Sequence, residues 1–462
     1  MDNKHQKTQE FLALTSGKMS EPLMPPMQRH VLPIALQSTE NSSDTHTIME
    51  AVCDRDNLKK ALARVRQNKG SPGIDGMTVD DLVPYLKEHW PSLKEQLLKG
   101  TYQPQPVKQV EIPKPGKGKD VRKLGIPIAP DRFIQQALMQ VLQEIIDPTF
   151  SEQSFGFRPG RSAHQAIVKA QDYITQGYRV VVDIDLEKFF DTVNHDKLMS
   201  EMAKRITDKR VLKLIRSFLR VGILKDREKI LSEEGTQQGS PLSPLLSNVL
   251  LDLFDKELER RGLRFCRYAD DCNVYVKSDR AGHRIMTSLR LFLTTKLKLK
   301  VNEQKSAVSR VYRRSFLGFS FTSGKTPKRR IAPEAIERFK KKIQLYTRAS
   351  KGMSMEKVMV NLAKYLRGWL SYFGFCQTPS VLKDLESWLH RRLRCAFWRQ
   401  WKTGKNKGTQ LRHRGVRYKL SRNTAGTNKG PWHTSNSPAL CIALSGDYFK
   451  KCGLPQFGKR SG

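Results

Sequence analysis

The chain has few of the features that mark secreted, zinc-binding or membrane proteins. Its seven cysteines include no C-x-x-C pair, which excludes a paired-cysteine zinc ribbon, and their odd number and wide spacing favour a reducing compartment. No apolar run reaches the ~18 residues that a bilayer-spanning helix needs, so we expect no membrane partner. The N-terminus lacks a signal-peptide pattern and carries Asp2, Glu10 and Glu21, which argues against a transit peptide. These absences predict a cytoplasmic protein.

Acidic residues are scarce in the C-terminal third. Residues 310–462 hold 34 lysines and arginines but only six aspartates and glutamates, and no acid lies between Glu386 and Asp447. The whole chain of 462 residues carries a formal net charge of +38. An excess of this size favours a polyanionic partner, above all nucleic acid, over an effect on solubility alone. The acids that metal chemistry requires lie upstream of this basic region.

The N-terminal part of the chain alternates helical and strand-like patterns. Residues 1–48 mix Met, Pro, Gln, Ser and Thr without periodicity, and we expect a flexible leader there. Helical patterns fill much of 49–100. Short β-like runs then flank a Lys/Gly-rich loop at 114–120, which predicts a hairpin with a basic tip. An apolar-faced helix is expected at 131–146.

The remainder of the chain completes a mixed α+β pattern. YRVVVDID, at 178–185, is typical of a buried strand, and RYADDCNVYV, at 267–276, predicts two strands joined tightly at its acidic pair. A helix is expected at 281–297. After residue 330 the pattern becomes helical and basic. The last sixty residues are rich in Gly, Asn, Lys and Arg and show few helix signals, so little helix is expected there.

Two short segments concentrate the acids that could carry chemistry. Side chains alternate along a strand, so Asp183 and Asp185 share one face. Asp270 and Asp271 are adjacent like charges in a strand-like context, so they form either an ordinary polar turn or a site held by cations. If the two segments are neighbours in one sheet, Asp185 and Asp270 converge. Mg²⁺ suits such a site because it takes carboxylate oxygens and retains positions for phosphate oxygens and water, and two such ions support in-line phosphoryl transfer.

Several longer motifs occur in the order found in reverse transcriptases. They are FGFRPGRSAH (155–164), DLEKFFDTVNH (185–195), QGSPLSP (238–244), YADD (268–271) and FLGF (316–319). More narrowly, the chain resembles the proteins encoded by bacterial group II introns. GIDGMTVDDL (73–82) is similar to their N-terminal extension, and YLRGWLSYFGF (365–375) is similar to their thumb-like maturase region. The resemblance covers roughly residues 50–400.

The resemblance implies a right-hand polymerase architecture with fingers, a palm built on a ferredoxin-like sheet and a helical thumb. The implied divisions are a flexible leader at 1–48, an N-terminal extension at 49–100, reverse transcriptase fingers and palm at 101–320, a thumb or maturase domain at 321–402, and a basic nucleic-acid-binding tail at 403–462. Some family members end in an endonuclease domain with paired C-x-x-C ligands. This chain reaches Gly462 without them, so we expect the subgroup that lacks that domain.

Catalytic roles follow from the matched motifs. The resemblance implies that Asp185, Asp270 and Asp271 are catalytic acids holding two Mg²⁺ ions, for which Mn²⁺ can substitute. Asp183 is then an extra strand acid with a weaker claim as a ligand. Lys305, in VNEQKS, matches a lysine proposed to protonate the departing pyrophosphate.

Nucleotide-binding roles follow in the same way. Phe190 matches the ring beneath the incoming sugar, where a bulky side chain clashes with a 2′-OH; plain core packing is the alternative. Gln238 and Gly239 match the loop that touches nucleotide and template. Arg122 and Lys114 match finger residues that hold the triphosphate, although neighbouring lysines could substitute and a solvated charge run is the alternative.

The C-terminal region interleaves aromatic and basic residues, which suits phosphate neutralisation and base stacking, although at helical spacing most of the rings are expected in the core. Arg391, Arg392 and Arg394 are the expected nucleic-acid contacts, because charged residues seldom bury unpaired. The rings are Tyr365, Trp369, Tyr372, Phe373, Trp388, Phe397, Trp398 and Trp401.

The resemblance therefore implies an RNA-directed DNA polymerase that is also a maturase, aiding intron splicing and retrohoming by target-primed reverse transcription. The implied partners are group II intron RNA, target DNA, an RNA/DNA primer–template and dNTPs, in a bacterial cytoplasm near the nucleoid. One alternative is a non-catalytic RNA-binding splicing factor on a decayed polymerase scaffold, which the three intact aspartates disfavour. A second is a reverse transcriptase recruited to defence or sequence diversification, which the maturase-like segment disfavours.

Overall fold

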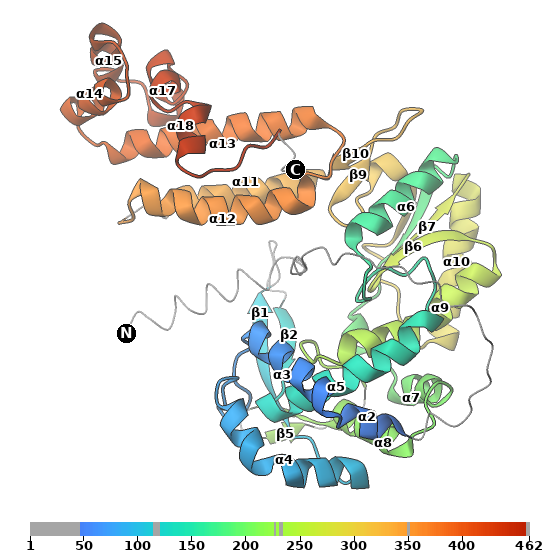
Figure 1. Ribbon diagram of the computed structural model, residues 1–462. Coiled ribbons are helices and arrows are strands. Elements are labelled where there is room, and N and C mark those ends of the chain that lie inside the picture. Colours follow the sequence, from blue (N-terminus) through green and yellow to red (C-terminus); the bar gives the residue numbers. More distant parts are fainter. Residues whose placement is uncertain (1–46, 114–120, 226–227, 231–233, 349–351, 459–462) are drawn as a thin grey trace, which may run out of the picture. The chain divides into compact units, whose positions relative to one another are not determined.

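The computed structural model describes residues 47–113, 121–225, 228–230, 234–348 and 352–458 (Figure 1). These residues form two compact units. Unit 1 contains the described residues up to Ala170 and from Tyr178 to Ser309, and unit 2 contains Gln171–Gly177 and the described residues from Arg310 onward. Within the described part of the chain, every helix is too short or too polar to cross a bilayer.

Several helices of unit 1 begin at a residue whose side chain caps them. The helical pattern expected from residue 48 splits at Asp54, because its side chain accepts the N–H of Asp56 at 2.8 Å and starts a new helix. Asp208 caps a later helix in the same way, through the N–H of Arg210 at 2.9 Å. The helices up to the end of unit 1 are α2 (Ile48–Val52), α3 (Arg55–Asn68), α4 (Leu82–Lys99), α5 (Ala129–Ile146), α6 (Ala163–Thr175), α7 (His195–Ala203), α8 (Lys209–Arg220), α9 (Ser243–Arg260) and α10 (Asp279–Lys296), with 3₁₀ turns η2 (Asp147–Thr149) and η3 (Phe189–Asp191).

The first sheet of unit 1 has the strand order β2–β1–β4–β5. β1 (Val107–Pro113) and β2 (Val121–Ile126) pair antiparallel, which confirms the predicted hairpin, while its tip at 114–120 lies outside the described residues. β4 (Ile223–Lys225) runs parallel to β1, and β5 (Glu228–Ile230) pairs antiparallel with β4.

The second sheet has the order β6–β7–β3–β8 and carries the acidic segments. Its strands are β3 (Val180–Ile184), β6 (Arg264–Tyr268), β7 (Asp271–Val276) and β8 (Ala307–Arg310). β3 pairs antiparallel with β7, and β7 pairs antiparallel with β6, so the expectation that the strand and the hairpin are neighbours is confirmed. Helix α10 packs on β3 and β7, and α9 contacts β6 (Figure 1).

Unit 2 is built on one strand pair and a set of helices. β9 (Phe319–Phe321) and β10 (Arg329–Ile331) pair antiparallel after the turn η4 (Val311–Arg313). The long helices α11 (Pro333–Arg348), α12 (Met355–Phe373) and α13 (Pro379–Gln400) pack together around a core. As expected, many of the aromatic residues belong to this core: Trp369, Phe397, Trp398 and Trp401 are buried.

The last sixty residues differ from the sequence expectation because most of them are folded. They form α14 (Gly404–His413), α15 (Tyr418–Ala425), α16 (Pro431–Thr434), α17 (Pro438–Ala443) and α18 (Gly446–Lys451). Leu440, Phe449 and Phe457 are buried in the core of unit 2. Such short helices are marginal alone and depend on side-chain caps, here Ser437 and Ser445, and on packing. Local helix patterns therefore gave little sign of them.

Candidate active site

The strand β3 ends at the acidic segment of the second sheet. Four of its five residues, three valines and an isoleucine, are buried, and these residue types favour a strand. The fifth, Asp183, is half-buried. Asp185 follows directly. Its N–H donates to Ser306 Oγ at 3.0 Å, and its carbonyl accepts the N–H of Asn302 at 2.8 Å. The backbone of Asp185 is therefore held from the 302–306 loop, and its half-buried carboxylate is left for other partners.

The turn between β6 and β7 explains why two aspartates are adjacent in the sequence. Tyr268 pairs with Asp271, so Ala269 and Asp270 form a two-residue turn. Ala269 has φ +57°, the left-handed conformation that tight hairpin turns require. Asp270 thus lies in the turn, and Asp271 is the first residue of β7. The pair is a turn residue and a strand residue rather than two successive strand positions.

The register of β3 and β7 brings two of the three predicted acids to neighbouring strand ends. The last ladder pair is Ile184 with Cys272, and the next position in that register sets Asp185 opposite Asp271. Among the residues that the structure describes, however, no group of three or more His, Cys, Asp or Glu side chains is close enough to hold a metal ion.

Lys305 also reaches this sheet edge. Its Nζ lies 3.4 Å from Asp185 Oδ2, with about two thirds of the lysine side chain exposed. Exposed ion pairs of this kind add at most about 1 kcal/mol to the free energy of unfolding, so this contact contributes little to stability. It does set a proton-bearing ammonium beside the first predicted catalytic acid. The carboxylate oxygens are hard donors, whose chemistry fits Mg²⁺.

The segment 235–239 connects Phe190 with the β1–β2 hairpin. Thr236 N–H donates to the Phe190 carbonyl at 2.6 Å, and Gly125 N–H, in β2, donates to the Gln238 carbonyl at 3.0 Å. Gly239 has φ +109°, and a Cβ there would lie 3.1 Å from the Gly125 carbonyl oxygen, so glycine suits the position. Three residues predicted to contact the nucleotide therefore belong to one hydrogen-bonded framework.

The surroundings of Phe190 agree in part with the core-packing alternative. Its ring is half-buried, packs against the core of unit 1 and meets Phe189 edge-to-face at 5.3 Å. Of the two predicted triphosphate ligands, Arg122 is exposed on β2, and Lys114 lies outside the described residues.

The three predicted nucleic-acid arginines of α13 make contacts within unit 2. The Arg391 guanidinium lies 4.2 Å from the Trp432 ring centroid, Arg392 Nε donates to Thr347 Oγ1 at 3.1 Å, and Arg394 Nε donates to the Ser435 carbonyl at 2.8 Å. Each is half-buried, and burial lowers the pKa of Arg392 and Arg394. Arg391 and Arg394 thereby attach the 432–435 segment to α13.

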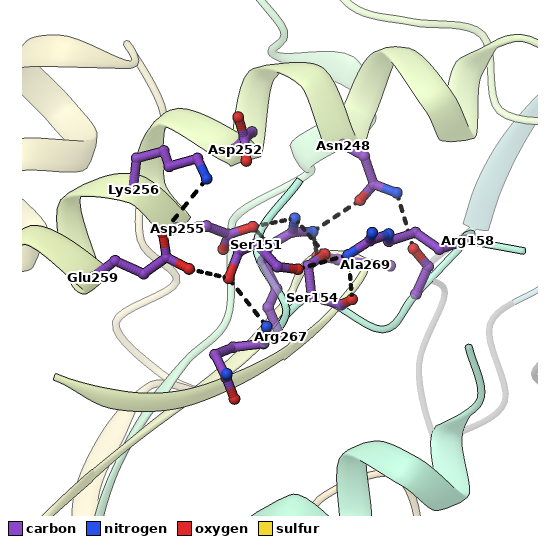
Figure 2. A network of polar contacts seen from close by, with 12 residues as sticks. Ser151, Ser154, Arg158, Asn248, Asp252, Asp255, Lys256, Glu259, Arg267 and Ala269 are labelled. Atoms are coloured by element: carbon purple, nitrogen blue, oxygen red, sulfur yellow. Dashed lines mark hydrogen bonds and ion pairs between the residues drawn. The ribbon is translucent and has the colours of Figure 1, made fainter. Parts of the chain in front are cut away.

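Sequence reasoning missed the polar side chains beneath the Ala269–Asp270 turn. Arg267, Asp255 and Asn248 are buried there, next to Ser154, which directly precedes the FGFRPGR motif, and Arg158 within it (Figure 2). The available signal was Arg267 itself, a charged residue between Cys266 and Tyr268 in the predicted strand that leads to the acidic pair. Its partners could not be read from the sequence because they lie up to 113 residues away.

Two family models match the chain. One, described as "Reverse transcriptase (RNA-dependent DNA polymerase)", matches residues 112–321, and the other, "Group II intron, maturase-specific domain", matches residues 336–415. Protein YkfC of Escherichia coli (strain K12) is 32% identical over a match of 314 residues that covers 59% of this chain and 82% of YkfC.

Other similarities cover less of the related chains. The group II intron-encoded protein LtrA of Lactococcus lactis subsp. cremoris is 28% identical over 341 residues, and the match covers 60% of this chain and 56% of LtrA. A chain in the solved structure titled "Partial Cas6-RT-Cas1--Cas2 complex" is 26% identical, with a TM-score of 0.36, and matches 58% of this chain and 46% of its own length.

Proposed function

The chain belongs to the group II intron-encoded reverse transcriptases that carry a maturase domain, and on that basis we propose that it is an RNA-directed DNA polymerase that also assists intron splicing. The observation that carries the proposal is the antiparallel pairing of β3 with β7, whose register leads Asp185 to the position opposite Asp271. Paired strand-end carboxylates beside a phosphoryl-transfer motif suit nucleotidyl transfer better than RNA binding alone.

We assign the parts of the hand accordingly. The second sheet, with α9 and α10, is the palm; the β1–β2 hairpin with its neighbouring helices forms the fingers; and α11–α13 form the thumb. The assignment is supported by the position of the acids on the second sheet and by the exposed basic residues of β2, Arg122 and Lys123.

The reaction would be attack of a primer 3′-OH on the α-phosphate of a dNTP. Asp185, Asp270 and Asp271 would hold two Mg²⁺ ions, which when bound activate the hydroxyl and neutralise charge on the leaving oxygens. The Lys305 ammonium, already at Asp185, would hold the proton that the departing pyrophosphate receives. The Phe190 ring would contact the sugar of the incoming nucleotide, where it would clash with a 2′-OH. Gln238 and Gly239 would align the nucleotide with its template.

The maturase role would require no catalytic residue. Residues 310–462, with 34 basic and six acidic residues, account for +28 of the net charge of +38, and Arg391, Arg392 and Arg394 lie on α13. Basic residues on a rigid helical scaffold suit phosphates of a structured intron RNA and of target DNA at the nucleoid, where target-primed synthesis and retrohoming would occur.

The test is primer extension by purified protein on an RNA template with dNTPs and Mg²⁺. Wild type should make cDNA, Asp270→Asn should make none, and Asp279→Asn, an exposed acid at the start of α10, should match wild type. Binding of intron RNA should persist in all three proteins. Polymerisation that survives Asp270→Asn would refute the site, and inactive wild type that still binds RNA tightly would indicate a splicing factor without polymerase activity.

A further inference from the structure

A buried arginine lies directly beneath the Ala269–Asp270 turn. Arg267, in β6, is 1% exposed, and its Nη1 donates to the carbonyl of Ala269 at 2.9 Å (Figure 2). We propose that Arg267, fixed by Asp255, is a positioning residue that sets the geometry of the Asp270 and Asp271 carboxylates. The inference rests on the proposed polymerase function, which it deepens.

The turn needs support from outside its own backbone. Ala269 has φ +57°, a conformation that residues with a Cβ rarely adopt, so the turn keeps this shape only where its surroundings enforce it. Asp270 follows Ala269 directly. A hydrogen bond to the Ala269 carbonyl therefore acts on the peptide group that joins the strained residue to the predicted metal ligand.

The guanidinium that makes this bond is itself held on several sides. Nε donates to Asp255 Oδ1 at 2.7 Å, and Nη2 donates to Asp255 Oδ2 at 2.5 Å, a bidentate pair in which Asp255 is 0% exposed. Nη2 also donates to Ser154 Oγ at 2.7 Å, and Nη1 to Asn248 Oδ1 at 2.9 Å. Lysine could not reproduce these contacts, because only the planar guanidinium offers several fixed donors at once.

Residues 153–156 form a second set of contacts with the turn. The backbone at 153–155 bonds to the backbone of Arg267 in both directions, through Arg267 N to Gln153 O and Phe155 N to Arg267 O, each at 2.9 Å. Gly156 then lies so near that a Cβ there would be 2.2 Å from Ala269 N. Asn248 Nδ2 donates to the Gly156 carbonyl at 2.9 Å. One amide side chain, Asn248, thus joins the glycine to the arginine.

Positioning explains this network better than stability does. A buried ion pair gives little net stability compared with well-packed apolar residues. Carboxylates that hold metal ions, in contrast, must stay within about 0.5 Å of the productive geometry, and their supporting contacts fix that geometry. Helix α9 also carries Asp252, which forms an ion pair with Arg205 at 2.6 Å and provides a control pair of the same charge types.

The experiment replaces the pair as a whole. Arg267→Met with Asp255→Leu removes both charges, so no unpaired buried charge remains, and Arg205→Met with Asp252→Leu is the control. Ser154→Ala, which removes one bond and keeps the ion pair, and Gly156→Ala, which crowds the turn and keeps every charge, are made in parallel. Thermal unfolding, template–primer affinity, kcat, the dNTP KM and the Mg²⁺ concentration for half-maximal extension are measured for each.

The pair variant and Gly156→Ala should keep template–primer affinity but lose on the order of 10²-fold in kcat. Their half-saturating Mg²⁺ should rise by roughly 10-fold or more, since loss of a supporting contact weakens metal affinity to about that degree. Ser154→Ala should shift both quantities less, in the same direction, and it keeps the test decisive if a more severe variant fails to fold. Partial unfolding would lower the amount of active protein without moving the Mg²⁺ midpoint.

Three outcomes separate the two proposals. Inactive wild-type protein would refute the polymerase function itself. Active wild type, inactive Asp270→Asn and network variants with wild-type kcat and Mg²⁺ midpoint would refute only the positioning role. A control pair variant that loses kcat and Mg²⁺ affinity as strongly as the Arg267 pair would also refute it, because any buried ion pair of α9 would then have the same effect.

Discussion

Asp131 should make unit 1 less stable as the pH rises. This carboxyl group, in the first turn of α5, accepts the Tyr102 hydroxyl at 2.6 Å and the Gln105 N–H at 2.9 Å, and it is 1% exposed. Burial raises its pKa from 3.8 to about 6, and the two hydrogen bonds offset this only in part. Most carboxyl groups in folded proteins shift in the other direction.

The size of the effect follows from the two pKa values. Between 3.8 and about 6 the folded protein binds the proton more tightly than the unfolded chain, so this contribution to stability is complete below 3.8 and is lost as the pH rises through about 6. At 1.36 kcal/mol per pH unit the whole loss is about 3 kcal/mol. About 2 kcal/mol of it falls between pH 4.5 and pH 8.

The assay compares wild type with Asp131→Asn by denaturant unfolding at the two pH values. Trp90 reports unit 1 in ¹⁹F NMR of 5-fluorotryptophan protein, because its ring meets Phe133 edge-on at 5.8 Å and the other five tryptophans lie at or beyond residue 369. Wild type should lose about 2 kcal/mol relative to the variant on going to pH 8. The exposed control Asp80→Asn should follow wild type. Parallel pH profiles for wild type and Asp131→Asn would refute the reasoning.

Three further predictions concern nucleic-acid binding, nucleotide choice and the fold of the C-terminal segment. RNA affinity should fall by about 10³–10⁵ between 50 and 200 mM salt if six to ten phosphates are neutralised; flat binding would remove the electrostatic argument. Phe190→Val should raise incorporation of rNTPs relative to dNTPs in single-nucleotide extension, and an unchanged ratio would leave Phe190 as a packing residue. Phe449→Ala, at a 0% exposed position, should cost unit 2 about 3–5 kcal/mol of unfolding free energy in denaturant curves, whereas a cost near zero would mean that the last sixty residues are not part of its core.

Local patterns were enough to predict much of the candidate site. The valine-rich run before Asp185 specifies a buried strand by composition, and the acidic pair between two apolar runs specifies a hairpin, because both signals depend on neighbours within a few residues. The β1–β2 hairpin and the helices α5 and α10 were predictable for the same reason. The excess of basic residues after residue 310 needed only counting.

What the tertiary structure decided depends on residues far apart in the chain. The partners of Arg267 come from Ser154 and from Asp255, and only folding brings them beneath the turn. The short helices after residue 403 form because Phe449 and its neighbours bury apolar surface in unit 2, although their own propensity is weak. The residues that would do the chemistry were therefore readable in order along the chain, whereas the contacts that hold them in place were not, because burial and hydrogen bonding between distant segments leave no local pattern.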